Sequence, residues 1–289
     1  MQAPWVNDAE FIGYFVALQN GWYKAEGLDL VYQPGGPDII AEGTLLSKRA
    51  DIALTPMETT ANLVVRDHAP LKVIGTQYQK SPLGVVSLRK SQINNPQDLI
   101  GKTLAVPPAN ILTVEALLKL NHIKKSDVKI VPYQYDPSPL LRGEVDATID
   151  FVTNVPYAIE QAGGVPSSFL IYDFGFKVYN DTVVVTDETL RERRHDIVAW
   201  IRASRRGWDE NFKDPAHYPP QFEGTYFKGT GRTVQNEVFF NRAQESLIKT
   251  PAGVFSMTEA DINANIESLR SIGINATREI FVTDLLREV

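Results

Sequence analysis

Leu45-Leu46-Ser47-Lys48-Arg49-Ala50-Asp51-Ile52-Ala53-Leu54 recurs in outline 95 residues later, as Leu140-Leu141-Arg142-Gly143-Glu144-Val145-Asp146-Ala147-Thr148-Ile149. The Leu-Leu pair, the aspartate and the closing apolar residues keep the same offset. Upstream, Glu26–Val31 is echoed loosely by Ser126–Val131, about five residues out of that register. Each copy has the pattern helix, strand, helix ending in Leu-Leu, Asp, strand and loop. Leu-Leu and Asp are common, but the shared order of elements favours two similar lobes over coincidence.

Helix and strand patterns alternate through the first half of the chain. Apolar residues follow the period of one helix face in Glu10–Asn20, whereas Leu28–Tyr32 alternates like a short strand. Ile39–Ser47 is predicted as the next helix and Asp51–Thr55 as a buried strand. Strands that alternate with helices form βαβ units. We therefore predict an α/β fold in which each lobe is a mainly parallel sheet flanked by helices.

Two segments are predicted to cross between the lobes. The first, 77–82, separates the predicted strands Leu71–Thr76 and Leu83–Leu88, and the second, 172–179, precedes a strand at Thr182–Val185. We predict that residues 1–79 and 177–289 form lobe 1 and that residues 80–176 form lobe 2. Two crossings make a hinge. Lobe 1 is expected to be completed by helices at Leu190–Phe212, Asn236–Leu247, Glu259–Ile272 and Thr283–Glu288.

The composition limits the possible partners. Of 289 residues, 43% are hydrophobic and 22% charged, which is ordinary for a globular protein. The net charge of −6 does not suit a nucleic-acid partner. The densest basic run, from Arg191 to Arg206, is interleaved with acidic and apolar residues, as on a solvated helix face. No apolar stretch approaches 18 residues, the length needed to cross a membrane.

Met1 stands almost directly before Gln2–Trp5, which reads as the end of a first strand. We expect that a leader has been removed, with a cytosolic protein as the alternative. The chain has no cysteine, which leaves no disulfide, zinc–thiolate site or cysteine nucleophile.

A ligand site is predicted where strands end. Ligands of open parallel sheets bind beyond the carboxyl ends of the strands, and the repeat locates two such ends, at 55–60 and 150–154. Further strand-to-helix junctions lie at 4–8 and 107–110. The predicted ligand-binding residues are Trp5, Asn7, Phe11, Tyr14, Met57, Glu58, Tyr78, Asn110, Asp150, Phe151 and Asn154.

Each role has a structural alternative. Trp5 is expected to form a stacking wall, although core packing is the alternative. Glu58 is expected to accept from an amine or amidine-like edge, unless it is only a solvated acid at a helix N-terminus. Asp150 has a hydrogen-bonded structural role as its alternative, and packing alone is the alternative for Met57 and the aromatic residues. Gly35-Gly36 reads as a turn, because no G-x-G-x-x-G order or Walker lysine accompanies it.

An enzyme is the less favoured prediction. The four histidines, His68, His122, His195 and His217, are not paired at helical spacing, and no H-E-x-x-H or G-x-S-x-G motif occurs. No acidic cluster has the spacing of metal ligands, so we expect neither a metal nor a cofactor. Aromatic, amide and carboxylate groups without a base–nucleophile pair suit binding better than catalysis.

Four segments together resemble the NMT1/THI5-like solute-binding proteins, with the match running from about Trp5 to Thr186. They are Phe11–Leu30, Ala50–Leu54, Asn95–Val106 and Gly143–Ala147. The resemblance implies a type II periplasmic-binding-protein fold with its ligand cleft between the lobes. It also implies a monomeric, periplasmic or membrane-tethered extracytoplasmic protein that serves the permease of an ABC importer.

Relatives in this family bind thiamine-pyrimidine precursors, riboflavin, sulfonates, nitrate or taurine. Because the predicted cleft offers Glu58 and Asp150 and few basic residues beyond Lys80, a small anion is disfavoured. We expect a planar nitrogen heterocycle stacked on Trp5, Tyr78 or Phe151. The alternatives are a nitrate, sulfonate or taurine binder, a sensory ligand-binding module and a thiamine-pyrimidine synthase. The synthases carry a cysteine-rich signature that this chain lacks.

Overall fold

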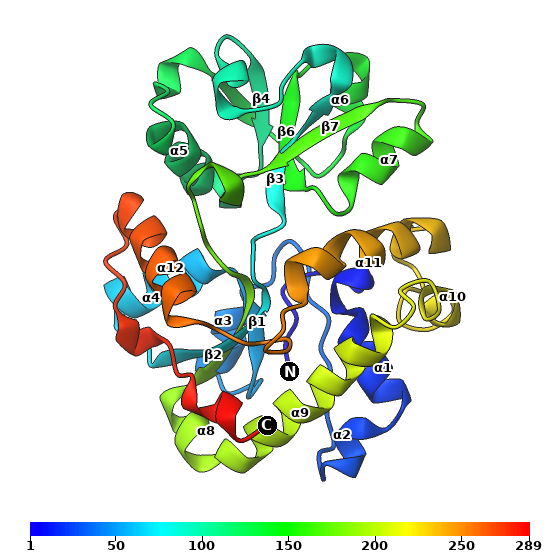
Figure 1. Ribbon diagram of the computed structural model, residues 1–289, viewed down its shortest axis with the longest axis vertical. Helices are drawn as coiled ribbons and strands as arrows, with labels where there is room; N and C mark the ends of the chain where they lie inside the picture. The colour runs from blue at the N-terminus through cyan, green and yellow to red at the C-terminus, as the bar shows by residue number, and fades with distance from the viewer.

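Two β-sheets organise the chain, one in each lobe, and the computed structural model describes all residues from 1 to 289 (Figure 1). The sheet of lobe 1 has the order β1-β8-β2, with β1 at Ala53–Thr55, β8 at Asn180–Thr186 and β2 at Leu71–Tyr78. The sheet of lobe 2 has the order β5-β4-β6-β3-β7. Its strands are β3 (Leu83–Leu88), β4 (Thr103–Val106), β5 (Lys129–Pro132), β6 (Ala147–Phe151) and β7 (Pro166–Leu170).

The two sheets share one topology. Gln2 forms parallel bridges to Gln33 and to Ala53 of β1, so the strand-like order in lobe 1 is Gln33, Gln2, β1, β8, β2. Lobe 2 repeats it as β5, β4, β6, β3, β7. The predicted repeat also holds in register, because Leu54 pairs with Val183 just as Ile149 pairs with Val85. The prediction of two similar lobes in an α/β fold is therefore confirmed.

The prediction of mainly parallel sheets was wrong. Only β4–β5 and β4–β6 are parallel ladders, whereas β1–β8, β2–β8, β3–β6 and β3–β7 are antiparallel. The reason is the hinge. β3 and β8 each enter a lobe from the crossing segments and run against the strands beside them. Leu28–Tyr32 also forms no strand, because Gln33 makes only the single bridge to Gln2.

Helices cover both faces of the sheets (Figure 1). Lobe 1 contains α1 (Ile12–Gln19), α2 (Trp22–Ala25), α3 (Ala41–Leu46), α4 (Met57–Asp67), α8 (Asp187–Glu192), α9 (Arg194–Asn211), α10 (Pro219–Phe222), α11 (Val234–Ile248) and α12 (Glu259–Ser271). Lobe 2 contains α5 (Ile111–Leu120), α6 (Ser138–Arg142) and α7 (Val155–Gln161). The predicted helix at Leu190–Phe212 is divided at Arg193, and the one at Thr283–Glu288 is a 3-10 turn, η8 (Asp284–Arg287). No helix is both long and apolar enough to cross a bilayer.

Close packing of α1 against α9 fixes the segment that precedes the cavity. A Cβ atom on Gly207 would overlap the carbonyl oxygen of Gly13, and a Cβ atom on Gly13 would overlap the ring of Trp208, so both glycines are needed for this approach. Tyr14 stacks on Trp200 with ring centroids 5.7 Å apart. Its hydroxyl donates to Gln77 at 2.9 Å. These buried contacts anchor α1, and with it the polar loop that leads into the helix.

The two crossing segments lie side by side. The backbone N–H of Ser81 donates to the carbonyl oxygen of Val178 at 3.1 Å. Lys80 pairs with Asp173 at 3.3 Å and lies over the ring of Tyr172 at 5.2 Å. The hinge is thus a pair of adjacent connecting segments, one between β2 and β3 and one leading into β8.

Candidate functional site

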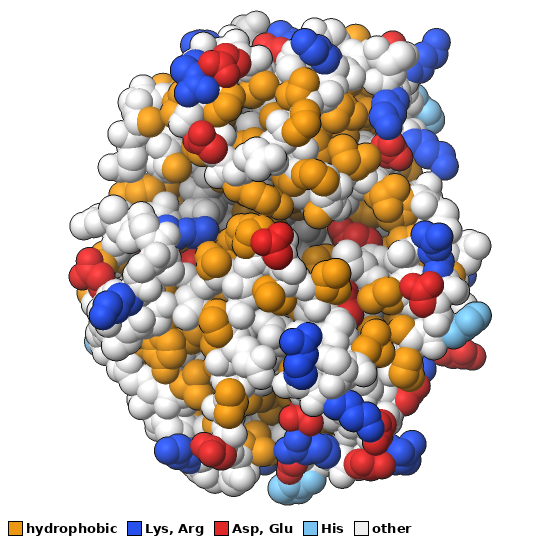
Figure 2. All heavy atoms as spheres, turned by 180° about the vertical axis from the view of Figure 1, so that it is seen from behind, with side chains coloured by type: hydrophobic (Ala, Val, Ile, Leu, Met, Phe, Trp, Pro, Cys, Tyr) orange, Lys and Arg blue, Asp and Glu red, His pale blue; other side chains and the backbone are white.

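A cavity of about 250 Å³ lies between the lobes, at the level where the space-filling view shows a hollowed waist (Figure 2). Both lobes contribute to its wall. From lobe 1 come Pro4, Trp5, Asp8, Glu10, Pro56, Glu58, Asn180, Asp181, Arg232 and Phe240. From the hinge and lobe 2 come Ser81, Leu83, Ala109, Asn110, Tyr135, Ile149, Asp150, Phe151, Asn154 and Val155.

Aromatic rings from opposite lobes meet at this cavity. The rings of Trp5 and Tyr135 are 5.1 Å apart and inclined at 55°. Phe151, at the end of β6, lies edge-on to Tyr78 with centroids 6.2 Å apart. A planar ligand between the lobes would therefore meet π-faces from both sides.

Two acidic groups of lobe 1 lie next to each other. Asp181 is on β8 with φ 46°, a left-handed conformation that is strained for a residue with a side chain. Its carboxylate accepts from Gln77 Nε2 at 3.1 Å. Burial raises the pKa of Asp181 to about 7. Burial and the adjacent Asp181 carboxylate raise the pKa of Glu10 well above its usual value.

One arginine faces these acids and is already engaged. Arg232 Nη1 lies 2.6 Å from Asp8 Oδ2, although off the axis of a good hydrogen bond, and 4.0 Å from Glu237. Burial opposes the charge of Arg232, but the surrounding carboxylates outweigh it and raise the arginine pKa. Glu237 in turn accepts from the Ala9 backbone N–H at 2.6 Å. Arg232 is therefore in ion-pair range of Asp8 and Glu237 only, and its charge acts on Glu10 and Asp150 from further away.

Two further carboxylates come from the strand ends predicted by the repeat. Asp150 follows the buried part of β6 and accepts from the backbone N–H of Phe151 at 2.7 Å. Burial raises its pKa to about 6. Glu58, in the first turn of α4, accepts from Thr113 Oγ1 of lobe 2 at 3.3 Å. Burial raises the pKa of Glu58 as well.

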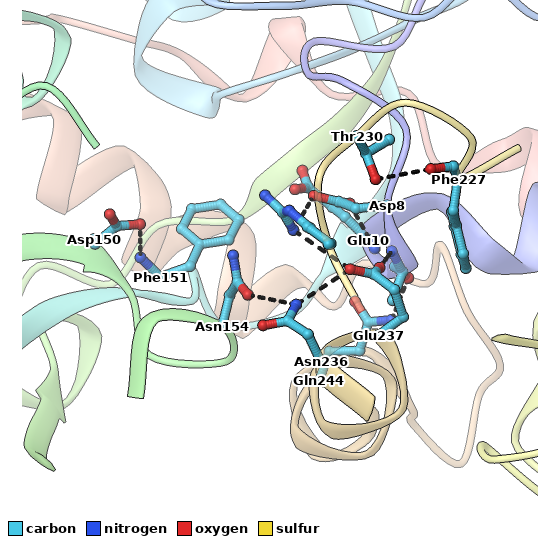
Figure 3. A network of polar contacts seen from close by, with 12 residues as sticks. Asp8, Glu10, Asp150, Phe151, Asn154, Phe227, Thr230, Asn236, Glu237 and Gln244 are labelled. Atoms are coloured by element: carbon cyan, nitrogen blue, oxygen red, sulfur yellow. Dashed lines mark hydrogen bonds and ion pairs between the residues drawn. The ribbon is translucent and has the colours of Figure 1, made fainter. Parts of the chain in front are cut away.

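Several contacts cross the cleft and link the two lobes at its rim. Asn236 of α11 donates to Asn154 at 3.1 Å and to Glu237 at 3.1 Å, so one amide links the rim of lobe 2 to the acid cluster of lobe 1 (Figure 3). The rings of Tyr157 and Phe239 lie 5.2 Å apart beside this link. A molecule in the cavity would be enclosed by both lobes.

Six of the eleven predicted binding residues line the cavity: Trp5, Glu58, Asn110, Asp150, Phe151 and Asn154. The other five do not. Phe11, Tyr14, Met57 and Tyr78 are fully buried in the hydrophobic cores, because the apolar face of each element points inward. Asn7 is half-buried beside the cavity.

Gly35-Gly36 forms no phosphate cradle, because its N–H groups donate to the carbonyl oxygens of Trp5 and Pro4. Lys80 stays at the hinge with Asp173. None of the four histidines lines the cavity.

Several wall residues were not predicted. Asp8 and Glu10 bracket the start of η1 (Ala9–Phe11), where Asp8 accepts the Glu10 backbone N–H at 2.9 Å. The predicted strand end at 4–8 indicated this region, but the sequence did not show that Asp8, and not Asn7, lines the cavity. Asp181 directly follows the second crossing segment, and an acidic residue at that position could have been predicted to face the cleft. Arg232 lies in a loop that no periodic pattern identifies.

The wall is suited to binding by hydrogen-bond acceptance. It offers carboxylate oxygens, amide groups and aromatic faces, and its carboxylates accept from neutral donors of the protein. No wall residue is a histidine, and the chain has no cysteine.

The NMT1/THI5 like family model matches residues 8–218. Riboflavin-binding protein RibY of Chloroflexus aurantiacus is 20% identical over 73% of this chain and 61% of its own length. The formylaminopyrimidine-binding protein of Halalkalibacterium halodurans is 24% identical over 73% of this chain and 65% of its own. A 4-amino-5-hydroxymethyl-2-methylpyrimidine phosphate synthase of Legionella pneumophila is 23% identical over 70% and 66%. The chain spans less than two thirds of each of these relatives.

Solved structures of other proteins superpose well on this fold. The periplasmic aliphatic sulphonate binding protein SsuA from Escherichia coli aligns over 100% of this chain and 96% of its own, with a TM-score of 0.73. The sequence identity is 11%, so this likeness shows the fold alone. The family model covers well over half of the chain, and its first matched residue, Asp8, lines the cavity. The chain belongs to the NMT1/THI5 like family and has the periplasmic-binding-protein fold.

Proposed function

We propose that this chain is the solute-binding component of an ABC importer and that it captures a small planar nitrogen heterocycle by closure of its two lobes. The observation that carries the proposal is the cavity between the lobes, in which aromatic rings of both lobes lie beside unpaired carboxylates. Ring nitrogens and exocyclic amino groups supply the donors that carboxylates accept. The rings supply stacking surface.

The size of the cavity favours a one-ring solute. Pockets for drug-sized ligands usually occupy roughly 300–1,000 Å³. At about 250 Å³, this cavity suits a substituted pyrimidine better than the three-ring system of riboflavin. Relatives named for formylaminopyrimidine and for riboflavin make both worth testing.

The charge of the wall argues against sulfonate, nitrate or taurine as the solute. The wall does offer amide donors, from Asn110, Asn154 and Asn180, but its five carboxyl groups would repel an anion, and a free cationic donor would be needed to offset them. The single arginine of the wall is held by Asp8 and Glu237. The likeness to SsuA concerns the fold, so it does not outweigh this chemistry.

The proposal includes a membrane partner and a location. A closed two-lobed shape is a surface that a permease can distinguish from the open one. We propose that the protein acts as a monomer outside the cytoplasmic membrane, free or tethered to it.

An enzyme of pyrimidine biosynthesis is the second candidate, supported by the named synthase among the relatives. We propose binding without turnover instead, because the wall holds no histidine and the chain holds no cysteine. Incubation with a tightly bound pyrimidine, followed by mass spectrometry, separates the two. Recovery of the unchanged solute supports the binding role, and formation of a product rejects it.

The primary test is a thermal-shift screen of pyrimidines, riboflavin, sulfonates, taurine and nitrate, followed by calorimetry. A ligand at 100 times its dissociation constant stabilises by about 2.7 kcal/mol. Small-angle scattering with and without the hit measures lobe closure. A response to taurine or nitrate, with none to any heterocycle, rejects the proposed solute.

A further inference from the structure

We infer that the solute is an organic cation, held by an ammonium or amidinium group between the Glu10–Asp181 pair of lobe 1 and Asp150 of lobe 2. This inference rests on the proposed binding function and narrows its solute from nitrogen heterocycles in general to positively charged ones. It follows from which charges face the cavity and from which partners those charges already have.

The cavity wall is strongly acidic. Five carboxyl groups line it, those of Asp8, Glu10, Glu58, Asp150 and Asp181, against one guanidinium group. That guanidinium is paired with Asp8 and lies 4.0 Å from Glu237, a sixth acid behind the wall. The other four carboxyl groups form no ion pair, and the charge of Arg232 reaches Glu10 and Asp150 only across a longer distance.

Three of the four unpaired acids have neutral hydrogen-bond donors, whereas the carboxyl group of Glu10 is buried at 4% exposure and accepts no hydrogen bond. Asp181 accepts from an amide of Gln77, Asp150 from a backbone N–H, and Glu58 from the hydroxyl of Thr113. Such bonds orient a carboxylate without neutralising it. Burying a charge without a counter-ion is costly. In the empty cavity a proton on the Glu10–Asp181 pair offsets part of this cost, as the raised pKa values of both groups indicate. A cation that enters the cavity replaces that proton and offsets the cost, whereas a neutral solute does not.

The placement of these acids also links charge to closure. Glu10 and Asp181 belong to lobe 1, and Asp150 belongs to lobe 2. When ionised, they repel one another as the lobes approach, and the repulsion grows as water leaves the cleft. A cation between them changes this repulsion into attraction. The cationic group of the solute would therefore favour the closed state. Asp181 lies at the start of β8, directly after the second crossing segment, so its contact with the cation acts close to the hinge.

The occupant fits an organic cation better than a metal ion. No group of three or more acidic or histidine side chains converges in a way that could hold a metal. The aromatic rings of Trp5 and Tyr135 at the same wall attract a flat cation through their π-faces.

Three probes of one shape test the inference: benzamidine, which is cationic at neutral pH, neutral benzamide and anionic benzoate. Calorimetry on the full chain should show benzamidine binding about 10- to 100-fold more tightly than benzamide, as expected for a charge-assisted contact. Benzoate should bind more weakly still. Equal affinities, a preference for benzoate or no binding of benzamidine would overturn the inference.

Matched variants locate the effect. Asp181→Asn and Asp150→Asn keep the shape and the acceptor oxygen, and each should reduce the preference for benzamidine about tenfold with little change for benzamide. Glu259→Gln, which alters an exposed pair with Arg278 outside the cavity, should change neither. Unchanged preference in both aspartate variants would place the cation elsewhere and reject the assignment.

The outcomes separate this inference from the proposed function. A neutral pyrimidine that binds tightly and closes the lobes, with no preference for benzamidine, supports the importer role and rejects the cationic solute. Binding of benzamidine with no response to any heterocycle supports the cationic solute and rejects the heterocycle of the proposed function.

Discussion

Replacing Asp150 by asparagine should stabilise the ligand-free protein at neutral pH. Asparagine has nearly the same shape, and its oxygen can still accept from the backbone N–H of Phe151, which Asp150 contacts at 2.7 Å. What the change removes is a carboxylate that burial disfavours. Burial raises the pKa of Asp150 from 3.8 to about 6 in the folded protein.

The size of the effect follows from this pKa. Between pH 3.8 and about 6 the folded state keeps the proton and the unfolded state loses it, so rising pH lowers the free energy of unfolding. Above pH 6 the ionised Asp150 lowers the free energy of unfolding by its full amount, about 3 kcal/mol, since each pKa unit corresponds to about 1.4 kcal/mol. Below pH 3.8 Asp150 is protonated in both states and does not lower the free energy of unfolding. The variant should therefore gain up to about 3 kcal/mol at pH 7.5 and almost nothing near pH 4.

Urea unfolding of both proteins across this pH range measures the difference, and thermal melts should show a gain of roughly 5 °C at pH 7.5. Glu144→Gln is a matched control in the same lobe, because Glu144 is exposed in a surface pair with Arg142. Its stability should change little. The reasoning fails if the Asp150 variant is no more stable at pH 7.5, or if its advantage persists unchanged in acid.

Three further outcomes are expected. Trp5→Ala should weaken solute binding about tenfold in calorimetry, whereas Trp22→Ala, which alters a ring stacked under an arginine outside the cavity, should not. Gly207→Ala should destabilise by roughly 1–3 kcal/mol in thermal melts, because its Cβ would overlap a backbone carbonyl; Gly224→Ala, with open space around it, should be near neutral. Arg232→Gln should cost about 3–5 kcal/mol at pH 7.5 in urea unfolding, and the loss should shrink near pH 5 as the buried acids that it faces take up protons.

The sequence predicted those parts of the fold that depend on local pattern. β1 and β6 lie where the repeat at 45–54 and 140–149 places them, because each is an apolar run that buries itself. The direction of the strands was not predictable in this way. It depends on β3 and β8, which enter from the hinge, and that arrangement involves residues far apart in the chain.

The candidate site divides similarly. Glu58, Asp150, Phe151 and Asn154 were predicted because each follows a strand of the repeat. The aromatic residues of the first helix were assigned to the cavity, although the same periodicity turns Phe11 and Tyr14 into the core. Asp8, Asp181 and Arg232 meet only through tertiary contacts between a loop start, a hinge strand and a long connection. Contacts between residues so far apart in the chain cannot be predicted from a local sequence pattern.

The strand order also bears on how the chain acquires its structure. Lobe 2 is built from one continuous segment, since all its strands lie between Leu83 and Leu170. Lobe 1 has β8 as its middle strand, and β8 begins at Asn180, long after β1 and β2. During synthesis from the N-terminus, lobe 2 can therefore form its sheet before lobe 1 can close around its own centre. The Asp181 carboxylate arrives with that strand, so the binding cavity would be among the last features of the molecule to assemble.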